Sequence, residues 1–305
     1  MNAHQDRTGA ARLFESRSGN QTGRRVDRLR AMVELGKKTV GSGPGAVLVM
    51  HDWLGDHTNY DLAVPCLNRE DFTWIFIDLR GHGLSRHHTG TFTCGEATDD
   101  VIRLADRLGI DRFHVVGHSM SSMIAQSIAV SVPDRVLSVI AITPLPASGL
   151  SLSRQTAESM RSVAISRYPM LEAANTGFRS HYKDFWLGAR ILSACDHSTP
   201  EARVGYMRMF TGTDFSARAN GIRVPVRAIV GENDMPAFQK ESVHDAFRKC
   251  YPDFQLIECR KAGHYPMLQF PALFASEIEQ LLFSVGPSRG GSLESTRAGA
   301  QCHGR

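Results

Sequence analysis

The central part of the chain alternates short apolar runs with longer amphipathic stretches. Six runs rich in β-branched and aromatic residues predict buried strands at residues 46–50, 73–78, 113–116, 136–142, 226–230 and 254–259. Amphipathic stretches predict helices near residues 59–67, 93–108, 120–130, 237–250 and 271–283. Thr93, followed three residues later by Glu96, forms a capping box at the start of the second of these helices. Apolar strands alternating with helices predict an α/β fold with a mostly parallel sheet covered on both faces.

One stretch interrupts this alternation. Residues 145–220 are helical in type and carry many aromatic and methionine side chains. An insertion at this point would lie over the carboxyl ends of the strands, where open α/β sheets bind ligands. We expect it to form a helical cap, and the alternative is a pair of crossover helices joined by a long loop.

Both ends of the chain differ from this central part, because they are poor in apolar residues. We expect residues 1–28 to form a disordered basic leader and residues 286–305 a disordered tail, which leaves one α/β domain at residues 29–285. The chain carries 35 Lys and Arg against 31 Asp and Glu, and seven of the arginines lie among residues 1–30. The remaining charges are close to balanced, so there is no indication of a nucleic-acid-binding surface.

The six cysteines show neither a C-x-x-C pair nor the spacing of zinc ligands. We therefore expect free thiols in a reducing compartment, no metal and no bound cofactor. No apolar run approaches the roughly 18 residues of a membrane-spanning helix, and the first residues lack the apolar stretch of a secretory signal. These observations predict a cytoplasmic protein with neither a nucleic acid nor a membrane as partner, and they leave its oligomeric state open.

A serine lies where the strand at 113–116 turns into the helix at 120–130. In Gly117-His-Ser119-Met-Ser121 a tight turn would expose the hydroxyl of Ser119, and the amino end of the helix would favour developing negative charge. Small residues are needed two positions before and after the serine, because the strand and helix backbones pass close to each other there. The alternative is that Ser119 serves only as a helix N-cap.

Two further residues would complete a catalytic triad with this serine. His264, in the loop after the last predicted strand, is the candidate base that removes the hydroxyl proton. Asp234, in the loop after the strand at 226–230, would orient the imidazole. Each of the three residues follows a strand, so all three can meet at one edge of the sheet. Their order along the chain, Ser then Asp then His, is that of the α/β-hydrolases.

The chain resembles the α/β-hydrolase superfamily from residue 40 to residue 285. Asp78-Leu-Arg-Gly-His-Gly-Leu-Ser85 is similar to that family's D-x-R-G-x-G-x-S loop, and His51-Asp-Trp-Leu-Gly55 stands where the family has H-G-x-x-G. The resemblance implies that the backbone amides of Trp53 and Met120 form an oxyanion hole. We assign His82 and Ser85, which lie within the first of these motifs, to the structural turn and not to catalysis.

The sequence departs from the family pattern at three places. Asp52 stands where the family has glycine, which puts a carboxylate beside the expected oxyanion site unless the residue only serves the turn. Ser121 adds a hydroxymethyl group where a glycine is expected. Residues 31–45 leave room for little more than one strand, so we expect the first edge of the sheet to be abbreviated.

Together these residues predict a serine hydrolase that cleaves a small, largely apolar ester or lactone. Ser119 would attack the carbonyl carbon, His264 would accept and return the proton, and water would release the acyl-enzyme. Aromatic side chains of the predicted cap, among them Trp186, Tyr206 and Phe210, would contact the substrate, or else they form the core of the cap itself.

Other functions remain open on the sequence alone. One is hydrolysis of a carbon–carbon bond in a dicarbonyl-type substrate, in which Arg190, Arg203 or Arg208 would hold a carboxylate unless these are solvated surface residues. Some members of the α/β-hydrolase superfamily, which this chain resembles, are cofactor-free oxygenases or perhydrolases, and others are ligand-binding receptors without catalysis. Epoxide hydrolase and haloalkane dehalogenase chemistry is disfavoured, because it needs a carboxylate where Ser119 stands.

Overall fold

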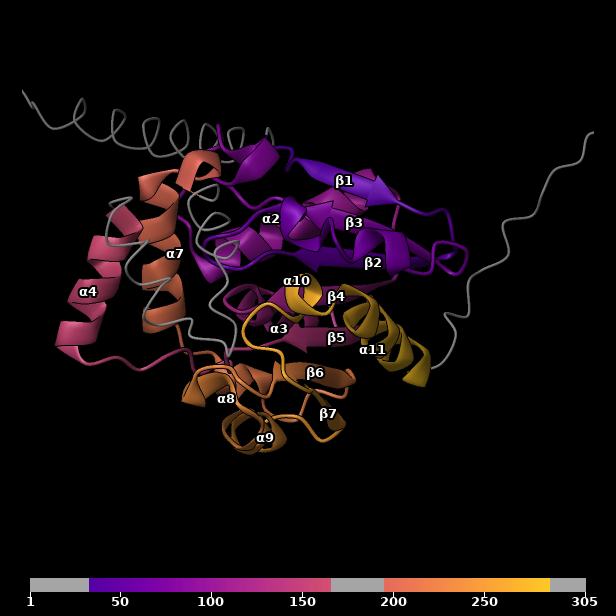
Figure 1. Ribbon diagram of the computed structural model, residues 1–305. Coiled ribbons are helices and arrows are strands. Elements are labelled where there is room, and N and C mark those ends of the chain that lie inside the picture. The colour runs from indigo at the N-terminus through magenta and orange to yellow at the C-terminus, as the bar shows by residue number, and fades with distance from the viewer. Residues whose placement is uncertain (1–32, 166–194, 286–305) are drawn as a thin grey trace, which may run out of the picture.

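The computed structural model describes residues 33–165 and 195–285. At its centre lies a seven-stranded sheet with the strand order β1-β3-β2-β4-β5-β6-β7 (Figure 1). The strands are β1 (Lys37–Val40), β2 (Gly45–Met50), β3 (Phe72–Ile77), β4 (Phe113–His118), β5 (Val136–Ile142), β6 (Val226–Gly231) and β7 (Phe254–Cys259). Strand β1 pairs antiparallel with β3, and all the other pairs are parallel. The edge strand β1 has four residues, which agrees with an abbreviated first edge.

The central strands are buried along their whole length. Every residue of β4 and β6 is buried, and Val47, Val115 and Ile140 have no accessible surface. Burial of consecutive residues requires cover on both faces of the sheet, which explains why these strands are continuous apolar runs in the sequence. All six predicted strands are confirmed, with ends that differ from the prediction by no more than two residues.

Helices cover the two faces of the sheet. On one face α2 (Cys94–Arg107) packs against α3 (Ser121–Ser131), which lies on β4 and β5. On the other face α11 (Pro271–Ser284) lies against β5, β6 and β7 and follows the short α10 (Pro266–Gln269) (Figure 1). Helix α9 (Lys240–Arg248) packs against β7. Over the described ranges, every helix is too short or too polar to cross a bilayer.

The helix predicted near residues 59–67 is wrong. The chain instead makes two 3-10 turns there, η1 (His57–Tyr60) and η2 (Val64–Cys66). The carboxylate of Asp56 caps η1, and Pro65 lies in the middle of the predicted helix. Proline has no amide hydrogen to donate and its ring clashes with the carbonyl four residues earlier, so a continuous helix is divided at this point.

The segment between β5 and β6 contributes α4 (Arg154–Ile165), α7 (Pro200–Gly212) and α8 (Ser216–Ala219). Helices α4 and α7 pack against each other and stand together beside the sheet (Figure 1). These helices belong to the segment for which the sequence predicts a cap. Residues 166–194 of that segment lie outside the described residues, so the cap remains a prediction.

Helix α7 fits closely onto the chain that follows β3. A Cβ atom at Gly81 would lie 2.3 Å from the Cβ atom of Ala202, and a Cβ atom at Gly205 would lie 2.6 Å from the side chain of Phe92. These distances leave no room for side chains at the two glycines, so the helix backbone can approach the loop. The result is that α7 lies over the carboxyl ends of the strands, where the candidate site is found.

Candidate functional site

The turn between β4 and α3 holds Ser119 in a strained conformation. Its φ angle is 53°, in the left-handed region that favours glycine, and its amide donates to the carbonyl oxygen of Ile142 at 2.8 Å. A Cβ atom at Gly117 would lie 2.2 Å from the carbonyl oxygen of Ser121 and 2.7 Å from the amide nitrogen of Ser122. The predicted close approach of strand and helix is therefore present, and it explains why residue 117 is glycine.

The structure brings Ser119, Asp234 and His264 together. Nε2 of His264 lies 3.0 Å from the hydroxyl oxygen of Ser119, and Nδ1 lies 2.9 Å from Oδ2 and 3.1 Å from Oδ1 of Asp234. The three residues follow β4, β6 and β7, whose carboxyl ends meet at one edge of the sheet. They are between 7% and 8% exposed, so the hydrogen bonds are largely shielded from water. This geometry allows the serine to donate its proton to Nε2 while Nδ1–H donates to the carboxylate.

The charge environment favours the protonated form of His264. Burial alone would lower the pKa of this imidazole, but the carboxylate of Asp234, with a smaller contribution from Asp52, raises the pKa above its ordinary value. An imidazolium that forms when the ring takes a proton from Ser119 is thus stabilised where it forms. In its neutral state the same ring can act as a general base.

The two residues whose amides are predicted to stabilise an oxyanion follow neighbouring strands, β2 and β4. Met120 follows Ser119 directly, and Trp53 follows β2, which pairs with β4 at Met50 and Gly117. Within residues 33–165 and 195–285, neither the Trp53 amide nor the Met120 amide donates to another group of the chain. Both N–H groups are therefore available for a ligand oxygen.

The carboxylate of Asp52 is buried and fully engaged. It accepts hydrogen bonds from the hydroxyl of Tyr265 at 2.8 Å, from Nδ2 of Asn59 at 2.6 Å and from the amide of Leu54 at 3.2 Å. Burial alone would raise the pKa of Asp52, but the neighbouring His118 and the Tyr265 hydroxyl lower it below its ordinary value. The carboxylate is therefore ionised; Leu54 and Asn59 hold it from its own segment of the chain, and Tyr265 binds it from the loop of His264.

His118 lies between Asp52 and the base. Its Nε2 donates to the carbonyl oxygen of His264 at 2.8 Å, and its Nδ1 lies 3.9 Å from Oδ1 of Asp52. Complete burial lowers the pKa of His118 to about 4, so the ring is neutral at physiological pH. Sequence reasoning did not identify His118, Asn59 or Tyr265, and no local motif pairs Asp52 with a residue 213 positions later.

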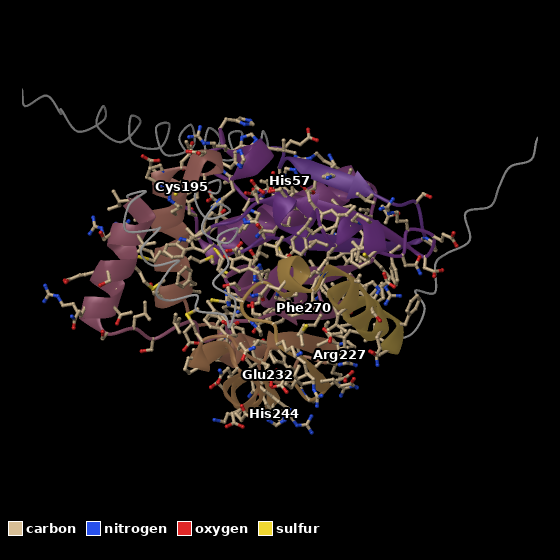
Figure 2. All side chains as sticks on the ribbon, viewed as in Figure 1. His57, Cys195, Arg227, Glu232, His244 and Phe270 are labelled. Atoms are coloured by element: carbon tan, nitrogen blue, oxygen red, sulfur yellow. The ribbon has the colours of Figure 1, made fainter. Side chains whose placement is uncertain are left out.

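The loop after β3 makes structural contacts, as expected. The buried carboxylate of Asp78 accepts from the amides of His57 at 2.6 Å and Leu84 at 2.7 Å, and it lies 2.8 Å from Nδ1 of His57, which is labelled in Figure 2. The hydroxyl of Ser85 accepts from a backbone amide at 2.7 Å. His82 is buried with Nε2 3.1 Å from the carbonyl oxygen of Trp53. This histidine therefore supports the loop that carries the Trp53 amide.

The residues predicted to contact substrate have different surroundings. Trp186 lies outside the described residues. The ring of Tyr206 is buried, 5.5 Å from that of His82 and 5.4 Å from that of Phe92, whereas the ring of Phe210 lies edge-on, 5.5 Å from that of Trp53. Tyr206 thus takes part in the packing of α7, and Phe210 lies beside the predicted oxyanion residue. Their contact with a substrate remains a prediction.

The arginines of this segment also differ from one another. Arg203 is buried and donates to the carbonyl oxygens of Ala164 at 2.7 Å and Ser198 at 3.0 Å, so it is neither a surface residue nor a free cation. Arg208 is exposed and lines a cavity of about 730 Å³ between α7 and the chain before α2. The lining of this cavity does not include Ser119. Arg190 lies outside the described residues.

The expectation that the protein holds no metal concerns groups of metal-ligating side chains. Among the residues that the structure describes, no three His, Cys, Asp or Glu side chains gather in a way that could hold a metal ion. The candidate site as described comprises a serine, a histidine, two carboxylates and two backbone amides.

Comparison with known proteins gives a family match and a fold match. The sequence model of the alpha/beta hydrolase family matches residues 43–277. The chain is 25% identical over 265 residues to the pimeloyl-[acyl-carrier protein] methyl ester esterase of Nitrosomonas europaea, a match that covers 82% of this chain and 100% of that protein. It is 37% identical over 105 residues to the dihydrolipoyllysine-residue acetyltransferase component of the acetoin cleaving system of Cupriavidus necator, which covers 34% of this chain and only 28% of that protein.

Among solved structures, the enol-lactonase from Burkholderia xenovorans superposes with a TM-score of 0.71. The sequences are 22% identical, and the match covers 81% of this chain and 96% of that one. At this level of identity the likeness concerns the fold alone. The fold class predicted from the sequence is confirmed by it.

Proposed function

Because the chain belongs to the alpha/beta hydrolase family, we propose that it is a serine hydrolase that cleaves a small, largely apolar ester or lactone through an acyl-enzyme on Ser119. One observation carries this proposal: Asp234, His264 and Ser119 form a continuous hydrogen-bonded series at the strand-to-helix turn. A hydroxyl is a weak nucleophile until a neighbouring base takes its proton, and His264 is in contact with it.

The reaction follows from this arrangement. The oxygen of Ser119 attacks the carbonyl carbon of the ester while Nε2 of His264 takes the proton, and Asp234 stabilises the resulting imidazolium. The amides of Trp53 and Met120 donate to the oxyanion of the tetrahedral intermediate. His264 then protonates the leaving alcohol, and a water molecule, activated by the same ring, hydrolyses the acyl-enzyme.

The proposed substrate class rests on a relative and on the surroundings of the site. The relative from Nitrosomonas europaea, which the chain matches over that protein's whole length, is named as a methyl ester esterase. Two apolar rings also lie beside the candidate residues: the ring of Phe238 lies 4.7 Å from that of His264, and the ring of Phe210 lies 5.5 Å from that of Trp53. We propose that α7 and its segment act as the cap over this site, and that the substrate is a small molecule.

Covalent labelling tests the proposal directly. A fluorophosphonate should label the wild-type protein at Ser119, and the wild type should hydrolyse short p-nitrophenyl esters. Ser119→Ala should abolish the labelling and lower turnover at least about 1,000-fold. Ser127→Ala is the matched control, because Ser127 lies on α3, the helix that follows Ser119, is buried and accepts from the hydroxyl of Thr98 at 2.9 Å, away from the site.

The proposal is contradicted if Ser119 proves dispensable. If Ser119→Ala retains labelling and turnover at the level of Ser127→Ala, then Ser119 is not the nucleophile. Comparison of turnover on esters, lactones and acidic diketones by the unlabelled wild type then identifies the bond that is cleaved.

A further inference from the structure

Asp52 and Ser121, which both stand where the family pattern has glycine, form hydrogen bonds that hold the same loop. We call residues 51–54, between β2 and η1, the oxyanion loop, because they include the Trp53 amide. From α3, the hydroxyl of Ser121 donates to the carbonyl oxygen of His51. From the loop after β7, the hydroxyl of Tyr265 donates to the carboxylate of Asp52 at 2.8 Å. The oxyanion loop is thus bonded both to the helix of the nucleophile and to the loop of the base.

Asp52 is not explained by the shape of the turn. Aspartate can be retained because it tolerates a left-handed backbone, but Asp52 is not among the described residues with positive φ. A buried carboxylate is costly unless hydrogen bonds compensate for the lost water. Here three donors do so, and one of them, Tyr265, is the chain neighbour of His264. The contacts of the carboxylate therefore point to a role beside the base.

We infer that Asp52 is a positioning residue of the proposed serine hydrolase: through the hydroxyl of Tyr265 it fixes the loop of His264 against the oxyanion loop, and its negative charge stabilises the imidazolium. This inference rests on the proposed function. His118 lies beside the same two loops: its Nε2 donates to the carbonyl oxygen of His264, and its Nδ1 lies 3.9 Å from Oδ1 of Asp52 without a hydrogen bond to it. Without the bond between Asp52 and Tyr265, the base His264 and the Trp53 amide would lie on two loops that are not joined to each other through these side chains.

The effect of the charge has a definite sign. Among the residues that the structure describes, the ionisable groups that face His264 are Asp234, Asp52, His118 and Tyr265; His118 is neutral above about pH 4, and the phenol of Tyr265 is bonded to Asp52. Removal of the Asp52 charge leaves Asp234 as the only anion acting on the ring from these neighbours, so the pKa of His264 falls. Because the base must be unprotonated, the acid limb of kcat/KM against pH then moves to lower pH.

Asp52→Asn and Tyr265→Phe test the inference. Asparagine keeps the shape of the side chain and removes its charge. Because Oδ2 of Asp52 accepts from both Tyr265 and Leu54 while Oδ1 accepts from Asn59, the asparagine also loses one of these hydrogen bonds, so the shift of the pH profile reports on the charge and kcat reports on the positioning. The phenylalanine keeps the ring and removes the bond between the two loops. Tyr60→Phe is the matched control, since it also removes a buried tyrosine hydroxyl near the end of β2, one that donates to the carbonyl oxygen of Met50 at 3.1 Å.

Both variants should lower kcat by about 10-fold or more on the ester that the wild type hydrolyses, with KM changed by no more than about threefold, because misplaced groups act on the transition state. Asp52→Asn should also shift the acid limb to lower pH. The double variant should lose little more than the larger single effect, because both changes remove one shared interaction. Tyr60→Phe should leave kcat and the pH profile as in the wild type.

Three results overturn the inference: kcat of both variants equal to that of Tyr60→Phe, an acid limb of Asp52→Asn that stays in place or moves upward, or a faster reaction in Asp52→Asn. If Asp52→Asn does not fold, Tyr265→Phe decides alone, and an unchanged kcat there rejects the role. A wild type that is neither labelled by a fluorophosphonate nor active on esters refutes the proposed function itself, and so the two failures are distinguishable.

Discussion

Replacement of Gly117 by alanine tests whether the turn of the nucleophile depends on the close crossing of β4 and α3. The new methyl group would lie 2.2 Å from the carbonyl oxygen and 2.5 Å from the carbonyl carbon of Ser121, and 2.7 Å from the amide nitrogen of Ser122. All three atoms are backbone, so no side chain can rotate away. Ordinary contact needs about 3.5 Å, and the helix would therefore have to shift by about 1 Å.

The cost of that shift follows from the position of α3. The helix packs on β4, β5 and α2, and nine of its eleven residues are buried. Overpacking of a core costs about 1–3 kcal/mol, and we expect about 3 kcal/mol here, because a helix has to move and not one rotamer. For a chain of this size that corresponds to a melting temperature lower by roughly 6–12 °C. The rate of fluorophosphonate labelling should fall too, since Ser119 loses its place relative to His264.

Gly95→Ala is the control for this measurement. Gly95 lies in the first turn of α2, and a Cβ atom there would meet nothing within 4 Å. Alanine is a better helix former, so the variant should be as stable as the wild type or up to about 1 kcal/mol more stable. Urea unfolding followed by circular dichroism measures both variants. A Gly117→Ala protein that unfolds within about 0.5 kcal/mol of the wild type and labels at the same rate would refute the reasoning.

Two other predictions concern the pH dependence of stability and the packing of α7 against the loop after β3. His114 lies buried beside the hydroxyl of Ser138, and burial lowers its pKa to about 4, so between pH 6.5 and pH 4 the unfolded chain binds a proton that the folded chain does not. Between pH 7.5 and pH 5 the free energy of unfolding of the wild type should therefore fall by about 2 kcal/mol more than that of His114→Gln; equal losses in urea titrations at the two pH values would reject this. Gly81→Ala, with φ at 75° and the new methyl group 2.3 Å from the Cβ atom of Ala202, should destabilise the protein by about 2–4 kcal/mol. Addition of Ala202→Gly should show a favourable coupling energy of at least about 1 kcal/mol in a double-mutant cycle, and simple additivity would show that α7 does not press on this glycine.

The strands and the three candidate catalytic residues could be placed from sequence because their signals are local. A buried strand in a parallel sheet is a continuous apolar run, and a residue that follows such a strand must lie at the carboxyl edge of the sheet. Ser119, Asp234 and His264 each follow one, so their meeting needs no knowledge of side-chain packing. The helix expected near residues 59–67 shows the limit of a periodicity argument, because one proline outweighs an amphipathic pattern.

What could not be predicted depends on contacts between distant segments. The hydroxyl of Tyr265 reaches a carboxylate 213 residues earlier, and neither residue carries a sequence signal for the other. Tyr206 and Phe210 lie one helical turn apart, so periodicity places them on the same side of α7. Their partners nevertheless differ, since one packs on His82 and the other on Trp53. Spacing along a helix identifies a face, whereas the partner of each residue on that face is set by the loops beneath it.

The position of the Asp52 charge decides which of two opposing effects dominates. In the proposed reaction, proton transfer from Ser119 to His264 and attack on the ester would create an imidazolium and an oxyanion, and one nearby carboxylate would attract the first and repel the second. If the carboxylate acted mainly on the oxyanion, Asp52→Asn would accelerate the reaction. One of its oxygens accepts from Tyr265, the chain neighbour of His264, and its charge contributes to raising the pKa of that imidazole. We therefore expect attraction to the imidazolium to prevail, and the direction of the change in kcat separates the two effects.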